Sequence, residues 1–551
     1  MMHRFLWSKL SRRLSMSTSA SASVKSKALQ NEHFFRYTSG RWLWDEEERL
    51  QERYRKFNVD ELKRIGAESI GAKSCVSITK LDEGGYNKVF KLVMDNGSVA
   101  IARIPCPNAG PPSMTTASEV ATMDFARTIL NLPVPKVHAW SAVSDNPVEA
   151  EYILMEEACG TSLGDIWEDM ELHSKVKIVE DIISIEQKLL SVSFSRYGNI
   201  YFAKDSFPGC EKAEVSGDIS EDLKQEVEER FTIGPVVEHA FWRRDQTSMP
   251  VDRGPWKSAD DYLKALANNQ VTWLSQYAPR KTPNIFQKSV AQESPDAHIA
   301  LYKKYLAICP YILPKDERMA RSTLWHWDLH ASNLFVKDER VTCIIDWQST
   351  WAGPLFAQYR YPKLVHYAGE VMLRLPDDYE TMEGNEKVEV SSQVQKSIVQ
   401  YLYESKTEDS NPLLTDIVNV PQRTVRKQTI AFAEDSWEGG ILSFRQCLIR
   451  LERYWDEMKH DAACPIHFSE EDLRNHVRDA EGYNEQADFW DSLEGFVARD
   501  GWTSNERYEE ALDLFAGIRE RGLEQLTGEE RSDFEKNSRW AQRSADRSDG
   551  S

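Results

Sequence analysis

The chain has 551 residues, 41% of them hydrophobic and 17 of them tryptophan, so it is too long for one compact core and we expect two or more domains or lobes. Its net charge of −20 argues against nonspecific binding to nucleic acid or anionic lipid, and no run of about 18 apolar residues predicts a transmembrane helix. Its eight cysteines show no CxxC spacing, which excludes a zinc ribbon or thioredoxin motif and is typical of reduced thiols in an intracellular compartment.

The first 31 residues differ in composition from the rest of the chain. They hold six Lys or Arg residues and no acidic residue, and Leu6, Leu10 and Leu14 recur at a spacing that lines one helical face. A basic, amphipathic, serine-rich start is typical of a mitochondrial transit peptide, which we predict for residues 1–31. The alternative is a disordered basic tail.

A strand-rich segment follows a charged extension. Residues 32–73 predict a helical N-terminal extension, and residues 75–104 predict three antiparallel strands. The Asp95-Asn96-Gly97 sequence predicts a tight turn between the second and third strands, because Asn and Gly tolerate the positive φ angles that such turns need. A helix is predicted over 113–132, where Pro133 stops it.

The remaining pattern is mainly helical, after one further strand at 151–158. Residues 325–347 predict a loop, a strand, a turn and a strand. Helices are predicted at 171–192, 258–277, 295–309 and 507–526, and helical patterns dominate from 395 onward. We therefore expect an α+β protein with a small antiparallel-sheet lobe and a large, mostly helical lobe. The predicted divisions are an N-lobe at 74–159, a C-lobe at 160–537 and a polar tail at 538–551.

Three polar side chains lie at the edges of strongly apolar runs. Asp328 and Asn333 belong to LWHWDLHASNLFV, and Asp346 belongs to IIDWQST. Charged groups avoid apolar surroundings unless a partner compensates them, and a metal ion or a proton in transit is such a partner. The alternative is that Asp328 caps a turn and Asp346 ends a strand with a local hydrogen bond.

The spacing of these residues resembles the protein-kinase-like fold and, within it, the aminoglycoside/choline phosphotransferase family. That family has an HxDxxxxN catalytic loop and a metal-binding Asp 18 residues beyond the first Asp, as in His326-x-Asp328-Leu329-His330-x-x-Asn333 and Ile345-Asp346-Trp347. The resemblance implies that Asp328 accepts the proton of the acceptor hydroxyl and that Asn333 and Asp346 bind Mg²⁺. It also implies that His326 braces the loop, whereas His330 either contacts substrate or is a satisfied loop histidine.

The same resemblance implies a nucleotide site. Its predicted residues are Gly84, Gly85, Tyr86, Asn87, Arg103, Glu119, Met155 and Glu157. The glycines lie between the first two strands, where backbone N–H groups would approach the phosphates of ATP, although two glycines there can also be a plain turn. Met155 and Glu157 lie in the strand that resembles the hinge between lobes, where backbone groups meet adenine.

The third strand departs from the family pattern. Arg103 stands at the apparent position of the family's lysine, with Lys88 and Lys91 as nearby substitutes in principle. Arginine keeps the charge but is longer and planar, so the exchange is not conservative. Glu119 matches the ion-pair partner of that lysine, but Thr116-Ala-Ser-Glu119 is also the spelling of a helix capping box.

Two further features concern substrate and location. Residues 349–365 stand in place of a long activation segment and lack an APE motif, which favours a small-molecule phosphotransferase over a regulated protein kinase. Segments such as YILMEEACGTSLGDIW are similar to the fungal mitochondrial phosphotransferase-like proteins of the altered inheritance of mitochondria group, which implies a mitochondrial address but no defined substrate.

Two functions are compatible with these features. The first is an ATP- and Mg²⁺-dependent phosphotransferase that acts on a hydroxyl of a small molecule in mitochondria, and the alternative is a kinase-like nucleotide-binding or scaffold protein with little turnover. We expect no nucleic-acid partner and no transmembrane segment. The acidic net charge suits a cationic acceptor, but a solvated acidic surface explains it equally well.

Overall fold

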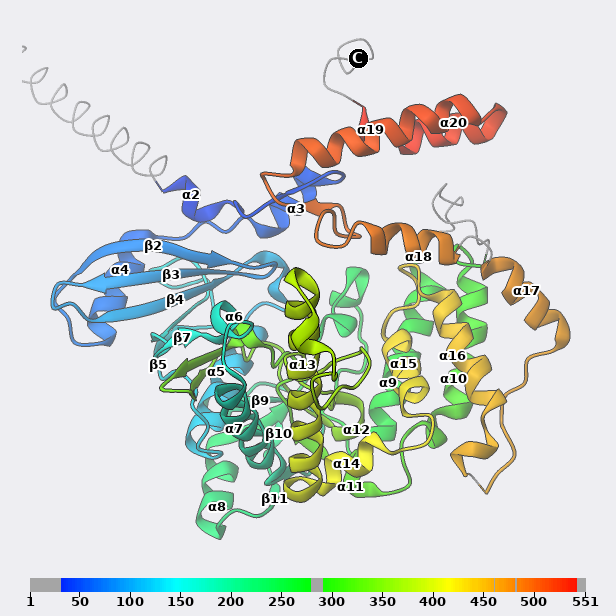
Figure 1. The fold of residues 1–551 in the computed structure, drawn as a ribbon. Helices are drawn as coiled ribbons and strands as arrows, with labels where there is room; N and C mark the ends of the chain where they lie inside the picture. The colour runs from blue at the N-terminus through cyan, green and yellow to red at the C-terminus, as the bar shows by residue number, and fades with distance from the viewer. Residues whose placement is uncertain (1–30, 279–290, 460, 481–482, 543–551) are drawn as a thin grey trace, which may run out of the picture. The chain divides into compact units, whose positions relative to one another are not determined.

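The computed structural model describes residues 31–278, 291–459, 461–480 and 483–542 (Figure 1). The predicted transit peptide at 1–31 lies outside the described residues except for Asn31, and so do the last nine residues of the predicted polar tail. Among the described residues, the first of two compact units holds the chain up to Ala109, His138–Leu154 and the chain from Trp490 onward. The second unit holds Gly110–Val137 and Met155–Phe489.

A five-stranded sheet with the strand order β2-β3-β4-β6-β5 carries the predicted antiparallel strands (Figure 1). Its strands are β2 Cys75–Glu83, β3 Asn87–Met94, β4 Val99–Pro105, β5 Val137–Ser141 and β6 Tyr152–Glu156. Burial alternates along β3, so Phe90, Leu92 and Met94 share one face, as the two-residue period of a strand requires. The helix α4 Val59–Ser69 buries Leu62 in the same core.

The predicted turn between β3 and β4 is confirmed. Gly97 has a φ of +81°, and its N–H donates to the Met94 carbonyl at 3.0 Å. An L-residue with a side chain rarely adopts this φ, so glycine at 97 fixes the register that sets Val89 opposite Arg103.

The first unit also joins the two distant ends of the described chain. Strand β1 Arg41–Trp42 pairs antiparallel with β17 Trp502–Thr503, and Trp42 Nε1 donates to Asp500 at 3.1 Å. The other elements of these ends are α2 Glu32–Phe35, α3 Glu46–Arg53, α19 Tyr508–Gln525 and α20 Gly528–Asn537. Residues from 490 onward thus group with the N-terminal extension, whereas the sequence pattern places them in the lobe at 160–537.

In its described residues, the second unit contains three small antiparallel sheets. Their orders are β10-β12-β9, β11-β8-β13-β16 and β15-β14-β7. The strands are β7 Thr161–Ser162, β8 Val192–Phe194, β9 Asn199–Phe202, β10 Glu211–Lys212, β11 Val215–Gly217, β12 Phe231–Gly234, β13 Ser322–Leu324, β14 Leu334–Lys337, β15 Arg340–Ile344 and β16 Ala352–Pro354. The strand-turn-strand predicted at the end of 325–347 is therefore confirmed as β14 and β15.

Helices make up most of the second unit, and its described residues form two apolar cores, to which both helices and strands contribute. The helices are α5 Met114–Thr128, α6 Leu163–Ile166, α7 Leu172–Leu190, α8 Glu221–Arg230, α9 Ala259–Gln276, α10 Pro295–Ile312, α11 Glu317–Ala320, α12 Leu355–Gln358, α13 Gly384–Ser410, α14 Pro412–Val418, α15 Arg423–Glu434, α16 Ile441–Arg453 and α17 Glu470–Ala480, together with most of α18 Tyr483–Ser492. On α7 the buried residues Ile178, Ile182 and Leu189 recur at helical spacing. The predicted α+β class with a strand-rich and a mostly helical lobe is confirmed.

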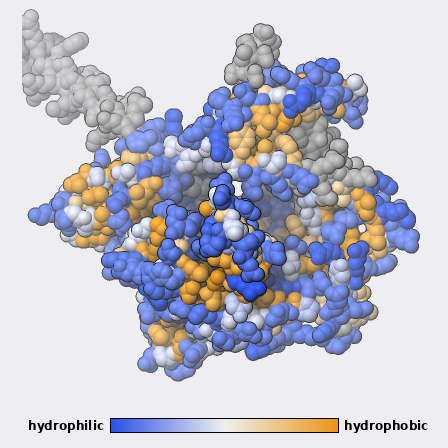
Figure 2. Space-filling model, in the orientation of Figure 1, coloured by the Kyte–Doolittle hydropathy of each residue, from blue (hydrophilic) through white to orange (hydrophobic). Residues whose placement is uncertain are grey.

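Membrane-spanning helices, surface hydropathy and cysteine pairing can each be described from the structure. In the described part of the chain, no helix is long and apolar enough to cross a membrane. Figure 2 shows hydrophilic residues over most of the face in view, with smaller apolar areas between them. All eight cysteines lie among the described residues and are unpaired, and most of them are buried.

Candidate active site

The predicted catalytic residues lie on the loop before β14 and just beyond the end of β15. The backbone N–H of Ile345 donates to the Asn333 carbonyl at 3.0 Å, which extends the pairing of β14 with β15 by one step. Asn333 ends the short helix η5 Ala331–Asn333, and Asp346 is the next residue after Ile345. Backbone hydrogen bonding therefore brings Asn333 and Asp346, which are 13 residues apart in sequence, to the same end of the β14–β15 hairpin.

Asp328 is held through its backbone rather than through its carboxylate. Its carbonyl accepts hydrogen bonds from His330 N and from Asn333 Nδ2, both at 3.0 Å. Its carboxylate oxygens lie 3.7 Å from Lys363 Nζ and 3.5 Å from His330 Nε2. Since no backbone N–H of the described residues donates to this carboxylate, the alternative that Asp328 caps a turn is wrong. The side chain, 27% exposed, is accessible to a hydroxyl group.

His326 braces the loop, as the resemblance implies. The ring is buried, and its Nε2 donates to the Ile345 carbonyl at 3.0 Å. It packs edge-on against Trp347, with 4.8 Å between the ring centroids. Burial lowers the pKa of His326, so the ring is neutral and the Nε2 proton is fixed by the carbonyl. His326 thereby holds the residue immediately before Asp346.

The polar contacts of His330 lie within its own loop. Its Nδ1 accepts a hydrogen bond from Ser332 N at 3.2 Å, which caps η5, and its Nε2 lies 3.2 Å from Asn333 Nδ2. These contacts are those of a satisfied loop histidine, and contact of His330 with a substrate stays a prediction.

Asn333 and Asp346 fit a magnesium site by their chemistry. The hydrogen bonds of the buried Asn333 amide in the described residues are made by Nδ2, so Oδ1 is the atom left for a metal. Asp346 is exposed, and its φ of +63° is a left-handed conformation that costs energy and recurs at functional sites. The neighbouring Trp347 is buried and donates from Nε1 to the Ile344 carbonyl at 3.1 Å, which anchors this turn.

One amide oxygen and one carboxylate are a small ligand set. Among the described residues no group of three or more His, Cys, Asp or Glu side chains could hold a metal by itself. Mg²⁺ commonly takes one or two protein carboxylates and completes its octahedron with water and substrate phosphates. The residues present therefore fit Mg²⁺ that arrives with a phosphate ligand.

The glycine loop of the first unit is an exposed hairpin turn. Gly84 N donates to the Asn87 carbonyl at 3.1 Å, and Asn108 Nδ2 donates to the Gly85 carbonyl at 3.1 Å. Neither glycine has a positive φ, and a Cβ built on either would meet no atom within 4 Å. Tyr86 is 44% exposed. The conformation and packing of this loop do not themselves require glycine.

Strand register separates the three candidate cations of the first unit. Lys88 lies opposite Ile104 on the core face, is fully buried, and has its Nζ 3.4 Å from Glu83 Oε2. Arg103 lies opposite Val89 on the other face, which it shares with Lys91. Lys88 is therefore excluded as a substitute for the family's lysine, whereas Lys91 is not.

The remaining predicted nucleotide residues belong to the second unit. Glu119 is buried in the middle of α5, which begins at Met114, so Thr116 is not an N-cap and the capping-box alternative is wrong. Its pairing with Arg103 stays a prediction. Met155 is half-buried near the end of β6, and Glu157 is exposed just beyond it.

Comparison with known proteins agrees with this geometry. Residues 260–357, which contain Asp328, Asn333 and Asp346, match the model of the phosphotransferase enzyme family (APH). The match covers the segment from residue 260 to residue 357, which holds all three predicted catalytic and metal-binding residues. The resemblance predicted from the catalytic loop is thus confirmed.

Two relatives with similar sequences come from fungi. A subtelomeric hrmA-associated cluster protein of Aspergillus fumigatus is 29% identical over 482 residues, which cover 80% of this chain and 91% of that protein. Altered inheritance of mitochondria protein 9, mitochondrial, of Saccharomyces cerevisiae is 25% identical over 558 residues, covering 87% and 88%. Among solved structures, aminoglycoside phosphotransferase APH(4)-Ia has a TM-score of 0.35 at 13% identity, covering 72% of this chain and 99% of that one.

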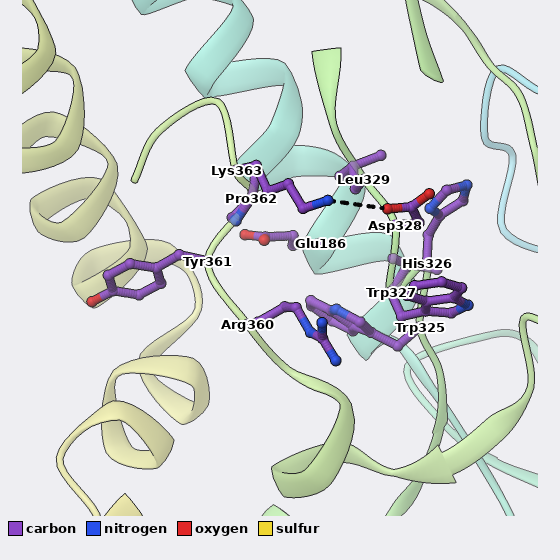
Figure 3. Close-up of a pocket in the computed structure, with 11 residues that line it drawn as sticks. Glu186, Trp325, His326, Trp327, Asp328, Leu329, Arg360, Tyr361, Pro362 and Lys363 are labelled. Atoms are coloured by element: carbon purple, nitrogen blue, oxygen red, sulfur yellow. Dashed lines mark ion pairs between the residues drawn. The ribbon is translucent and has the colours of Figure 1, made fainter. Parts of the chain in front are cut away.

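The site also contains residues that no sequence motif indicated. A small cavity of about 20 Å³ beside Asp328 is lined by Glu186, Trp325, Arg360 and Lys363, among others (Figure 3). Glu186 is buried and accepts hydrogen bonds from Tyr403 at 2.9 and 3.1 Å, and burial raises its pKa to about 8. The only sequence signal was a glutamate at a position of α7 that its helical period assigns to the buried face.

Proposed function

We propose that this protein is an ATP- and Mg²⁺-dependent phosphotransferase that transfers the γ-phosphoryl group to a hydroxyl of a small molecule. The observation that carries the proposal is the carboxylate of Asp328. It is accessible, it is not used in a turn, and its loop is tied by Asn333 Nδ2 to the hairpin that bears Asp346. Phosphoryl transfer requires mainly this kind of positioning and charge neutralisation.

Asp328 would act on the acceptor. Its carboxylate would accept a hydrogen bond from the acceptor hydroxyl and orient the oxygen toward the γ-phosphorus. As the new P–O bond forms, the bond from the γ-phosphorus to its bridging oxygen breaks, and ADP leaves with that electron pair. The hydroxyl proton passes to Asp328. The hydrogen bonds to the Asp328 carbonyl hold the backbone from which this carboxylate projects.

Asn333 Oδ1 and the Asp346 carboxylate would hold the metal. Bound Mg²⁺ would neutralise phosphate charge during transfer. His326 acts on this pair as a positioning residue, because it bonds the carbonyl of Ile345, whose N–H contacts Asn333.

The first unit would contribute to ATP binding. The absence of side chains at Gly84 and Gly85 serves neither the fold of the turn nor its packing, which is consistent with close approach of a phosphate to the backbone. Arg103 would contact phosphate oxygens, with Glu119 as its partner, and Met155 and Glu157 would lie near adenine.

A kinase-like binding protein with little turnover is the second candidate. It is favoured by Arg103 at the lysine position and by Lys88, which is committed to Glu83 and cannot replace it. A protein without catalysis, however, has no physical reason to hold Asp328, Asn333 and Asp346 together at one hairpin.

We also propose a mitochondrial location. Two features support it: the basic, amphipathic composition of residues 1–31, and the word mitochondrial in the names of relatives that match most of the chain.

The proposal is tested with the purified full chain, ATP, Mg²⁺ and a pool of hydroxylated metabolites. Asp328→Asn should abolish phosphoryl transfer while ATP still raises the melting temperature. Asp338→Asn is the matched control, because Asp338 is an exposed aspartate in the turn between β14 and β15. Undiminished transfer by Asp328→Asn would refute the enzymatic role.

A further inference from the structure

A second, larger cavity opens beside the catalytic loop, wholly within the second unit. Its volume is about 670 Å³, enough for a metabolite-sized ligand. The loop contributes His330 to its lining, α7 contributes Lys175, and α13 contributes Lys396. Lys363 lines both this cavity and the small one beside Asp328, so the two adjoin at that lysine.

The close approach of α6 to the catalytic loop forms one wall of this cavity. A Cβ on Gly164 would lie only 2.6 Å from Ser332 Oγ and 3.1 Å from Ser332 Cα. Glycine at 164 is thus required by packing, and it fixes the distance between the loop and the segment that carries Glu168.

The charge of this lining is opposite to that of the whole chain. Apart from its two histidines and one tyrosine, the titratable side chains that line the cavity are Lys175, Lys363, Lys396 and Glu168. Three ammonium groups therefore face one carboxylate in a protein whose net charge is −20. A local excess of one sign inside a concave surface concentrates ligands of the opposite sign.

Lys175 is the most deeply buried of the three lysines. It is only 6% exposed, and its Nζ donates to two neutral oxygens, the Glu168 carbonyl at 3.1 Å and Gln395 Oε1 at 3.4 Å. No carboxylate of the described residues forms an ion pair with it. Burial lowers the pKa of Lys175, and the nearby carboxylates of Glu168, Asp169 and Glu171 oppose this only in part. An ammonium has three N–H donors, so one remains for a ligand.

The other two lysines make loose, exposed ion pairs. Lys396 Nζ lies 3.6 Å from Glu168 Oε2, with side chains 50% and 71% exposed. Lys363 Nζ lies 3.7 Å from Asp328 Oδ1, a contact drawn in Figure 3, and its side chain is 73% exposed. Exposed pairs of this kind contribute little energy, so either lysine can turn to a ligand without a large cost.

We infer that this cavity binds the phosphate acceptor, and that the acceptor carries an anionic group, a phosphate or a carboxylate, in addition to its reacting hydroxyl. The role of the ligand as phosphate acceptor rests on the proposed function. The binding of an anion is argued from the lining of the cavity alone. An anionic acceptor is the opposite of the cationic acceptor that the net charge of the whole chain would suit. Lys175 and Lys396 would hold the anionic group, and Lys363 would lie at the end nearest Asp328.

The test compares ligands on one scaffold. Glucose 6-phosphate, gluconate, glucose and glucosamine offer phosphate, carboxylate, neutral and cationic forms of a hydroxylated six-carbon chain. Calorimetric titrations use full-length Asp328→Asn protein, so that binding is measured without turnover. Phosphate or carboxylate forms should bind, more weakly as salt is added, and the neutral and cationic forms should not. Preferential binding of glucosamine or glucose would overturn the inference.

Lysine variants assign the binding to this cavity. In the Asp328→Asn background, Lys175→Met keeps most of the side-chain volume over Trp167 and should raise the Kd of the bound anion about tenfold or more, the effect of roughly one charged contact. Lys396→Gln should also raise the Kd of the anion. Lys396 is exposed, so this substitution should not disturb the core. Lys406→Gln, on the same helix but paired with Glu180 outside the cavity, is the control and should leave the Kd unchanged. Equal affinity in all three variants would overturn the inference.

The two proposals can fail separately. In one outcome, anions bind in a way that depends on these lysines, but the wild-type protein does not turn over ATP with anionic acceptors of any length tested. That outcome would refute the phosphotransferase function and keep the anion site. Turnover of only neutral or cationic acceptors would keep the function and refute the site.

Discussion

His326 Nε2 donates a hydrogen bond of 3.0 Å to the Ile345 carbonyl, and this bond joins the start of the catalytic loop to the strand end that precedes Asp346. We predict that His326→Leu reduces turnover more than it weakens ATP binding, because it frees the turn that carries Asp346, the proposed metal ligand. The loss of a buried bond should also cost about 1–3 kcal/mol in the free energy of unfolding. His326→Gln keeps an N–H donor near the same place and should recover much of the turnover. Equal turnover loss in both variants would contradict the role of the bond.

Asp346 should affect the metal complex of ATP specifically. We predict that Asp346→Asn weakens binding of Mg·ATP more than binding of Mg-free ATP, because the substitution removes the carboxylate assigned to the metal. Isothermal calorimetry with and without Mg²⁺ measures both. An equal loss for the two ligands would show that Asp346 does not bind the metal.

Arg103 distinguishes the enzyme from a binding module. Arg103→Ala should cost about 1.5–3 kcal/mol of nucleotide affinity, typical of a charged hydrogen bond. Arg103→Lys should be tolerated or should raise turnover, because it restores the residue of the family pattern. Lys91→Ala is the matched comparison on the same face of the sheet. If Lys91→Ala were the damaging change, the phosphate contact would belong to Lys91.

Glu186 should make stability depend on pH. Burial raises its pKa to about 8 from an ordinary value of 4.5, so between these values the folded protein binds more protons than the unfolded chain. This term therefore lowers stability as pH rises through that window, by at most about 1.4 kcal/mol per pH unit. Glu186→Gln should remove the term, so its free energy of unfolding should exceed that of the wild type increasingly from about pH 5 to about pH 8.

Urea unfolding at both pH values measures this difference. Glu180→Gln is the control, because Glu180 lies on the same helix but is paired at the surface with Lys406. A Glu186→Gln advantage that is equal at the two pH values would show that the carboxyl does not titrate in this range.

The leader should direct import. Residues 1–31 fused to a fluorescent reporter should enter mitochondria, and Arg12→Glu with Arg13→Glu should prevent this by reversing charge on the basic part of the helix. Microscopy and fractionation give the result. A cytosolic wild-type fusion would leave the disordered basic tail as the better interpretation.

The sequence alone determined the features that depend on neighbouring residues. The strands at 75–104, the Asn-Gly turn and the helix at 171–192 follow from periodicity and turn chemistry, which act over a few residues. The fixed spacing of Asp328, Asn333 and Asp346 likewise predicted the resemblance to the phosphotransferase family whose model matches residues 260–357.

Only the tertiary structure decided the features that depend on long-range contacts. The pairing of β1 with β17 joins residues separated by more than four-fifths of the chain, and no local pattern specifies such a partner. Register, which alternates side chains across a strand, showed that Lys88 and Arg103 face opposite sides of their sheet. The basic cavity gathers Lys175, Lys363 and Lys396 from three separate segments. Nothing in the sequence around each lysine distinguishes it from any other lysine of the chain. The excess of positive charge in the cavity arises only because the fold brings the three side chains to one concave surface.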